Sequence, residues 1–179
     1  MMVQIKKLGL SEQEIQDLDS KGFGLDKKQK KMMLEMYDTH PASAIDLNKL
    51  AVDFNLPEDY RDFLLKNNGG IPIPNAVKTE GNIRVVNSLL ALNAPSGFYD
   101  SIDNYLEIYK DRIPNNTLPI ASAGSSDLIL MKTDGVGGIY YWDHNFESDG
   151  DGVENYYENM EMLASNFSEF LDLFYQPED

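Results

Sequence analysis

The sequence predicts an α+β fold, in which helices flank a mostly antiparallel central β-sheet and a helical extension precedes the domain. Two observations support this prediction. Helical patterns come first, short apolar segments separated by glycine-rich turns follow, and one helical pattern closes the chain. Strands and helices do not alternate one by one, as they do in proteins with a parallel sheet. We therefore expect residues 1–44 to form the extension and residues 45–179 to form the domain.

Residues 1–44 contain two helical patterns. Ser11 and Glu14 have the spacing of a capping box, which begins a short helix that ends near the glycines of KGFG. The segment LDKKQKKMMLEMYDTHP predicts a second helix, because its apolar residues are partly periodic and Pro41 follows its end. Its lysines are offset by nearby acidic residues, so a solvated helix face explains them better than nucleic-acid binding.

The domain begins with two further helical patterns. Leu47, Leu50, Ala51 and Phe54 recur at the spacing of one apolar helix face. The segment LPEDYRDFLLKNNGGIPIP then places Pro57 at the first helical position, where its missing N–H would be unpaired in any case. Two glycines end this helix, and the prolines after them predict an extended, edge-like passage.

The middle of the chain predicts the sheet. NIRVVNSLLALN is typical of one long strand or of a pair of strands, and SIDNYLEIYKDR of a helix. LPIASAG, SDLILMKT and GGIYYWDH predict strands, the last two joined as a hairpin across DGVGG. The final pattern, ASNFSEFLDLFY, predicts a closing helix with a phenylalanine-rich face.

The formal net charge of −15 is concentrated in the last third of the chain. Residues 114–179 hold thirteen acidic residues and one basic residue, Lys132. Such a surface repels nucleic acid and anionic membranes and attracts basic proteins, although a high net charge also serves solubility alone. The chain contains no apolar segment of membrane-spanning length, no signal-peptide pattern and no cysteine. We expect a cytoplasmic protein without disulfides or thiolate metal sites.

The chemical motifs favour a binding protein over an enzyme. GVGG at 135–138 lies between two predicted strands, whereas a phosphate-binding loop needs a helix after it. His144 stands beside Asp143, but no serine lies in a recognisable nucleophile turn, so a surface histidine at a strand end is the favoured interpretation. We therefore predict no catalytic residue, no cofactor and no metal ligand.

The loop DHNFESDGDGVEN is the most suggestive polar cluster. Its acidic spacing resembles that of a calcium-binding loop, yet Ser148 replaces the glycine needed for the sharp turn, and a strand precedes the loop instead of a helix. Calcium binding remains the alternative to protein binding. We expect a protein partner to contact the carboxylates of this loop and two tyrosines near it. The predicted contact residues are Asp143, Glu147, Asp149, Asp151, Glu154, Tyr140 and Tyr156.

The only tryptophan, Trp142, lies in the predicted strand IYYWDH. Strand alternation places Tyr140 and Trp142 on one face and Ile139 and Tyr141 on the other. Because one face must belong to the core, we expect a packed tryptophan. An exposed Trp142 would instead be a good interface anchor.

The segment LNKLAVDFNLPEDYRDFLLKNNGGIPIP resembles the N-terminal signature of the SUKH superfamily. IASAGSSDLILMKTDGVGGIYYWDHN is similar to its later hairpin with a tryptophan, and LASNFSEFLDLF to its closing helix. The likeness covers roughly residues 45–175. We interpret the matched signature positions as fold determinants. They are Leu56, Pro57, Tyr60, Phe63, Leu64, Asn68, Gly69, Gly70 and Trp142.

The superfamily includes the fungal Smi/Knr-type regulators of cell-wall glucan synthesis and many bacterial immunity proteins. The resemblance implies an α+β fold, no catalytic activity and a cognate secreted toxin as partner, often a nuclease. An acidic surface suits the basic groove in which a nuclease holds phosphates. A regulatory scaffold is the alternative, for which we would expect long disordered extensions. A calcium-dependent binder or a small hydrolase is a third interpretation.

Overall fold

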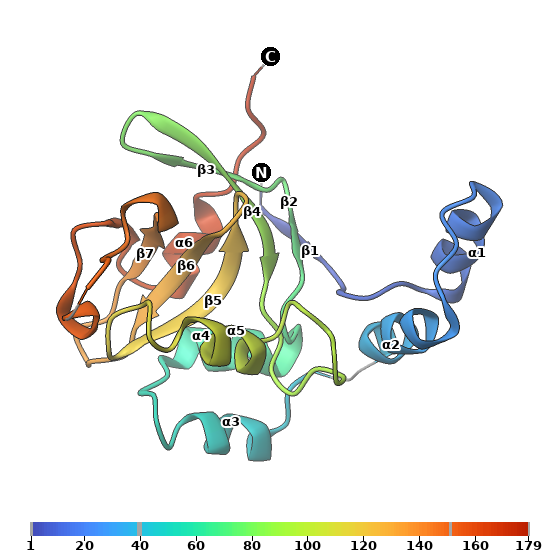
Figure 1. Ribbon diagram of the computed structural model, residues 1–179, viewed down its shortest axis with the longest axis horizontal. Helices are drawn as coiled ribbons and strands as arrows, with labels where there is room; N and C mark the ends of the chain where they lie inside the picture. The colour runs from blue at the N-terminus through green and yellow to red at the C-terminus, as the bar shows by residue number, and fades with distance from the viewer. Residues whose placement is uncertain (1, 39–40, 151, 179) are drawn as a thin grey trace.

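A six-stranded antiparallel sheet forms the centre of the computed structural model, which describes residues 2–38, 41–150 and 152–178 (Figure 1). Its strands, in order across the sheet, are β3 (Ala76–Thr79), β4 (Asn82–Leu89), β5 (Thr117–Ala123), β6 (Asp127–Lys132), β7 (Ile139–Trp142) and β8 (Met160–Ala164). A separate two-stranded sheet pairs β1 (Gln4–Lys6) with β2 (Ile71–Ile73). The predicted α+β class with an antiparallel central sheet is confirmed.

Helices and short 3-10 turns make up the rest of the regular structure. They are α1 (Glu12–Ser20), α2 (Lys27–Asp38), α3 (Ala44–Leu50), α4 (Glu58–Lys66), α5 (Ile102–Tyr109), α6 (Phe167–Asp172), η1 (His144–Phe146) and η2 (Val153–Asn155). The capping box of Ser11 and Glu14 begins α1 as predicted. Pro57 is the N-cap residue of α4, one position before the place that the sequence predicted for it. The sequence did not predict β1, β3 or β8.

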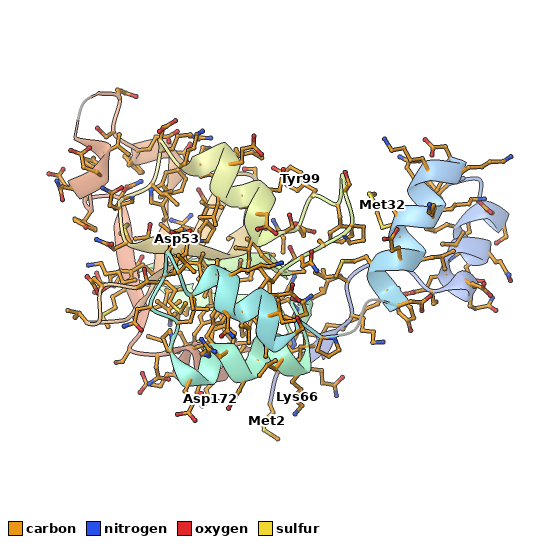
Figure 2. All side chains as sticks on the ribbon, turned by 90° about the horizontal axis from the view of Figure 1, so that it is seen from below. Met2, Met32, Asp53, Lys66, Tyr99 and Asp172 are labelled. Carbon is orange, nitrogen blue, oxygen red and sulfur yellow. The ribbon has the colours of Figure 1, made fainter. Side chains whose placement is uncertain are left out.

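The central strands are covered on both faces. Every residue of β5 is buried, and successive strand residues point to opposite faces, so each face must have a cover. On one face Tyr109 of α5 packs edge-on against Trp142 of β7, with ring centroids 5.9 Å apart. Figure 2 shows α5 on the opposite side of the domain from Asp172, the last residue of α6. Trp142 is 1% exposed, so the expected packed tryptophan is confirmed.

Helices α4 and α6 meet through aromatic side chains. The ring of Phe167 in α6 lies 4.9 Å from the rings of both Tyr60 and Phe63 in α4. Leu56 and Leu64 are buried in the same core. These signature residues are therefore packing residues, as their apolar spacing predicted.

Two signature residues just after α4, Asn68 and Gly70, hold this segment where other parts of the backbone pass close to it. Asn68 is buried, and its amide group bonds to both the N–H and the C=O of Leu92, at 2.8 and 2.9 Å. Gly70 has a positive φ, and a Cβ there would lie 2.2 Å from the side chain of Ile5 in β1. The glycine is required because β1 passes directly over it.

The N-terminal extension contains a strand as well as the two predicted helices. β1 pairs antiparallel with β2, with Gln4 opposite Ile73. A second apolar cluster then joins the start of the chain and α2 to the loop after β4, through Leu8, Met36, Ala91 and Phe98. The extension is packed on the domain, although the predicted boundary at residue 45 stays a prediction. Among the described residues, no helix has the length and apolar character needed to cross a membrane.

We predict that Met36→Ala lowers the free energy of unfolding by about 2–5 kcal/mol, because it leaves a cavity where α2 meets the loop after β4. Urea denaturation followed by circular dichroism measures the change. Phe23→Ala is the control, since Phe23 is exposed and its removal should cost less than about 0.5 kcal/mol. An unchanged midpoint for Met36→Ala would mean that the extension does not unfold together with the domain.

Candidate protein-interaction surface

Helix α5 has a buried tyrosine face and an exposed acidic face. Tyr105 and Tyr109 are buried toward the sheet. Asp103 and Glu107 are exposed four residues apart on one side of α5, and Asp111 is exposed two residues beyond the end of the helix. This acidic stripe was not predicted from the sequence, although the four-residue spacing is present there.

The acidic loop continues this surface beyond the C-terminal end of α5. The N–H of Asn115 donates to the carbonyl oxygen of Glu154, at 3.1 Å. A shallow pocket of about 290 Å³ lies between the two segments and is lined by Asp111 and Glu154, together with one exposed lysine, Lys110. Asp149 and Glu154 are exposed beside it. The stripe on α5 and these loop carboxylates together form what we call the acidic surface.

Glu147 has a structural role within this region. Arg112 donates two hydrogen bonds to its carboxylate, at 3.0 and 2.8 Å. These bonds raise the pKa of Arg112 although its partial burial opposes the charge. The guanidinium also lies over the rings of Tyr109 and Trp142, at 4.7 and 5.9 Å. Glu147 therefore anchors the loop to the turn just after α5, and its charge is already neutralised.

Asp143 is neutralised in a similar way. Its carboxylate accepts the backbone N–H of Asn145 at 2.9 Å and so caps η1, and it lies 3.4 Å from the guanidinium of Arg84. The side chain is 16% exposed. Glu147 and Asp143 were both predicted to face a partner, and the structure directs both inward to arginines.

The other predicted contact residues differ in how far they are exposed. Tyr140 and Tyr156 are half-buried, and Lys132 lies over the ring of Tyr140 at 4.9 Å. Tyr157, which the sequence analysis did not select, lies under the same ammonium group at 4.5 Å and is 40% exposed. Asp151 lies outside the described residues.

The carboxylate of Asp127 organises the strand ends beside the loop. It accepts hydrogen bonds from the hydroxyl of Tyr141 and from the backbone N–H of His144, the latter at 3.0 Å. It also pairs with the Nδ1 atom of His144 at 2.6 Å. Burial disfavours the charge of Asp127, but these bonds outweigh burial and lower its pKa. His144 is thus half-buried and bonded to Asp127, rather than the plain surface residue that the sequence predicted.

The same residues offer the donor atoms of a metal site. Asp127, Asp143 and His144 each bring one potential ligand atom within 4.8 Å of the others. Their atoms are already bonded to Tyr141, to Asn145 and to Arg84, whose guanidinium supplies the positive charge. The calcium alternative also loses support, because Asp143 and Glu147 would both have to leave their arginines to bind the ion.

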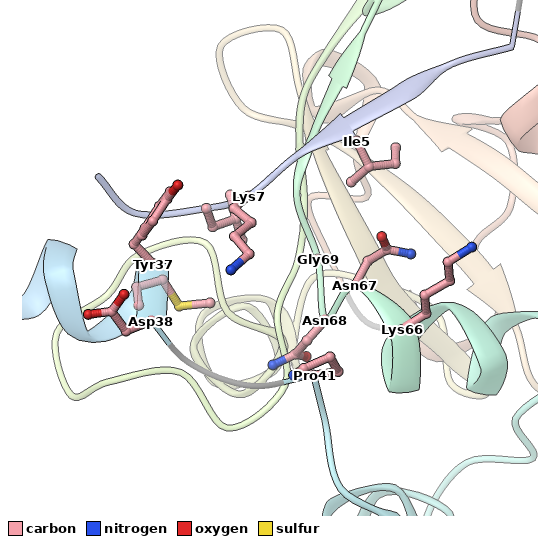
Figure 3. A pocket seen from close by; sticks show the side chains of 11 residues that line it. Ile5, Lys7, Tyr37, Asp38, Pro41, Lys66, Asn67, Asn68 and Gly69 are labelled. Carbon is pink, nitrogen blue, oxygen red and sulfur yellow. The ribbon is translucent and has the colours of Figure 1, made fainter. Parts of the chain in front are cut away.

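A larger pocket lies between the extension and the domain (Figure 3). It has a volume of about 360 Å³ and is lined by residues from the end of β1, from α2 and from the end of α4. Figure 3 shows Lys7 and Lys66 at opposite ends of it, and Lys7 lies over the ring of Tyr37 at 5.1 Å. The two lysine side chains do not converge on one point, so this pocket does not form a binding site for an anion. The acidic surface remains the candidate site.

Comparisons with known proteins agree with the resemblance found in the sequence. Residues 41–173 match the model of the SMI1 / KNR4 family (SUKH-1). A protein of Bacillus subtilis (strain 168), described as "SPbeta prophage-derived uncharacterized protein YokK", is 29% identical over 134 residues. The match covers 65% of this chain and 65% of the relative. The chain therefore spans just under two thirds of the length of that relative.

We predict that Asp127→Asn lowers the free energy of unfolding at pH 7 by about 2–3 kcal/mol, because charged hydrogen bonds are lost in a buried site. The folded-state pKa of Asp127 is lowered, so its contribution is present above the unfolded value of about 3.9 and is lost as pH falls through the folded value. Urea denaturation at pH 7 and pH 3 measures both effects. Asp62→Asn, an exposed control, should change little, and an equal loss at both pH values would contradict the electrostatic account.

Proposed function

The chain belongs to the SMI1 / KNR4 family (SUKH-1), and from this premise we propose that it is an immunity protein, which neutralises a cognate toxin by binding it. In this proposal it acts without catalysing a reaction, in the cytoplasm, and its partner is a basic toxin domain such as a nuclease. The observation that carries the proposal is the acidic surface along α5 and the loop. Nucleic acid and anionic membranes are unsuitable partners, because this surface repels both.

The charge of the acidic surface is available to a partner. Asp103, Glu107, Asp149 and Glu154 are exposed, whereas the neighbouring Glu147 is occupied by Arg112. Acidic groups outnumber the single lysine, Lys110, in this patch, and a net negative patch attracts a protein of opposite charge over several ångströms and speeds their encounter. A basic groove that binds phosphates is complementary to such a patch, so covering it would block access of the substrate.

Exposed apolar side chains beside the acids supply the contact area that charge alone does not. Ile108 lies on α5 and Tyr99 just before it, and Phe146 and Tyr157 lie in or next to the acidic loop; all four are exposed. Aromatic residues at the centre of a contact carry much of the binding energy, while rim charges mainly set the association rate. We therefore expect Tyr99, Phe146 and Tyr157 to be stronger anchors than the half-buried Tyr140 and Tyr156.

The test is a titration against the toxin domain encoded by the adjacent gene, with the activity of that domain measured in parallel. We predict that Asp149→Lys with Glu154→Lys lowers the association rate at low salt by roughly 10-fold or more, because electrostatic steering is lost. The difference should shrink at high salt, where charges are screened.

A matched control is Asp62→Lys with Asp172→Lys, which makes the same change in net charge on exposed residues of α4 and α6. Figure 2 shows Asp172 on the far side of the domain from Tyr99. Equal effects of both double variants would contradict the placement of the interface. Binding that leaves the toxin fully active would favour the regulatory-scaffold alternative, and no binding at any salt would refute the proposal.

A further inference from the structure

A pocket of about 160 Å³ lies along the buried tyrosine side of α5, between the loop before the helix and the turn from β5 to β6. One wall is the loop before α5, which carries Tyr99 and Asp100. The other wall is formed by the end of β5 and the turn into β6, with Ser122 and Asp127. Tyr109, the last residue of α5, also lines the pocket, and Asp127 joins its far wall to His144 at the start of the acidic loop.

Of the two carboxyl groups in the pocket, Asp127 is paired with His144, whereas Asp100 has no ion pair among the described residues. Among the described residues that line it there is no lysine, arginine or histidine. Burial raises the pKa of Asp100, and a hydrogen bond with the hydroxyl of Ser88 offsets only part of this effect. The partly buried carboxylates Asp143 and Glu147, by contrast, each lie beside an arginine. Among the residues that the structure describes, Asp100 is therefore a partly buried carboxyl without the ion-pair partner such groups usually have.

Three tyrosines line the same pocket as this carboxyl group. Tyr99 is 59% exposed, and its ring centroid lies 5.3 Å from that of Tyr105. Tyr105 stacks on Tyr109 at 5.6 Å, which extends the row of rings along the buried side of α5. The faces of aromatic rings attract cations, and arginine and lysine are the common protein cations found over them. The combination of rings and a carboxyl group is suited to an alkylammonium or guanidinium group.

We propose that this pocket binds the side chain of one lysine or arginine of the protein partner, with the cationic end at Asp100 and the methylene chain along Tyr99. The inference rests on the proposed function, because it assumes a basic protein lying along α5. The inference identifies this pocket as the place where that protein inserts one basic side chain. Asp127, on the opposite wall, is already hydrogen-bonded to Tyr141 and His144, so Asp100 is the carboxyl group left to meet the cation.

The dipole of α5 opposes a cation at this end only weakly. The hydroxyl of Ser101 caps the helix by accepting the N–H of Asn104, and Asp103 lies in the first turn. Both groups offset the partial positive charge of the helix N-terminus. The carboxyl groups and rings therefore determine which charge the pocket prefers.

The first test needs no partner protein. Nα-acetylarginine methylamide and Nα-acetyllysine methylamide are titrated into the full chain and followed by amide chemical shifts. We expect saturable shifts at residues 87, 99–105 and 122–127 with at least one compound, and about tenfold weaker binding of the neutral Nα-acetylcitrulline methylamide. Shifts that are absent, or equal for the charged and neutral compounds, would overturn the inference.

The second test uses Asp100→Asn with Asp103→Asn as the matched control, since both remove one charge and lie close together. Against the neighbouring toxin domain we expect Asp100→Asn to weaken binding roughly 30-fold, as for an anchor residue, and Asp103→Asn only a few-fold. Equal effects of the two variants would overturn the inference while leaving the proposed function intact. If the wild-type chain does not bind the toxin, the proposed function fails, and the amino-acid titration alone decides whether the pocket binds cations.

Misfolding does not complicate Asp100→Asn. The folded-state pKa of Asp100 is raised, so an ionised Asp100 lowers stability at pH values above the unfolded value, and an amide removes this cost. The urea midpoint at pH 7 should therefore rise or stay unchanged. A variant that is more stable and binds less tightly separates the binding role of Asp100 from a role in folding.

Discussion

The complete burial of β5 is the constraint on which the rest of the structure depends. A strand buried on both faces needs a layer on each side, and α5 provides one of them with Tyr105 and Tyr109. Once these tyrosines face the sheet, the period of the helix directs Asp103 and Glu107 to the solvent. The acidic surface is therefore the outer side of a layer that the core requires, and it is held on a regular helix rather than on a free loop.

Arginines from earlier in the chain decide which carboxylates of the last third remain available. Residues 114–179 have one basic residue of their own, yet Arg112 pairs with Glu147 and Arg84 with Asp143. A carboxylate that leaves water needs such a partner, whereas an exposed one is solvated and needs none. The acidic charge thus divides into a part that fastens the loop to the domain and a part that faces outward. Only the outward-facing carboxylates attract a charged partner from a distance.

Strong local patterns were predictable from the sequence, and pairings between distant residues were not. The capping box of α1, the tyrosine face of α5 and the hairpin of β6 and β7 follow from spacing and turn residues. β8 was missed because MEMLA has no β-branched residue, and it becomes a strand by pairing with β7. The acidic region was visible in composition. Its internal ion pairs were not, because they join residues 35 and 59 positions apart, a separation that no local pattern records.

The position of Trp142 gives the molecule a native optical reporter. It is the only tryptophan in the chain, and it lies one layer below the acidic surface, in contact with Tyr109 and beneath the guanidinium of Arg112. Indole fluorescence depends on nearby charge and on the packing of neighbouring rings. A shift of α5 or of Arg112 therefore alters the emission of a single, known fluorophore. Events on the outer face of the helix can be followed in the unlabelled protein, in real time and at low concentration.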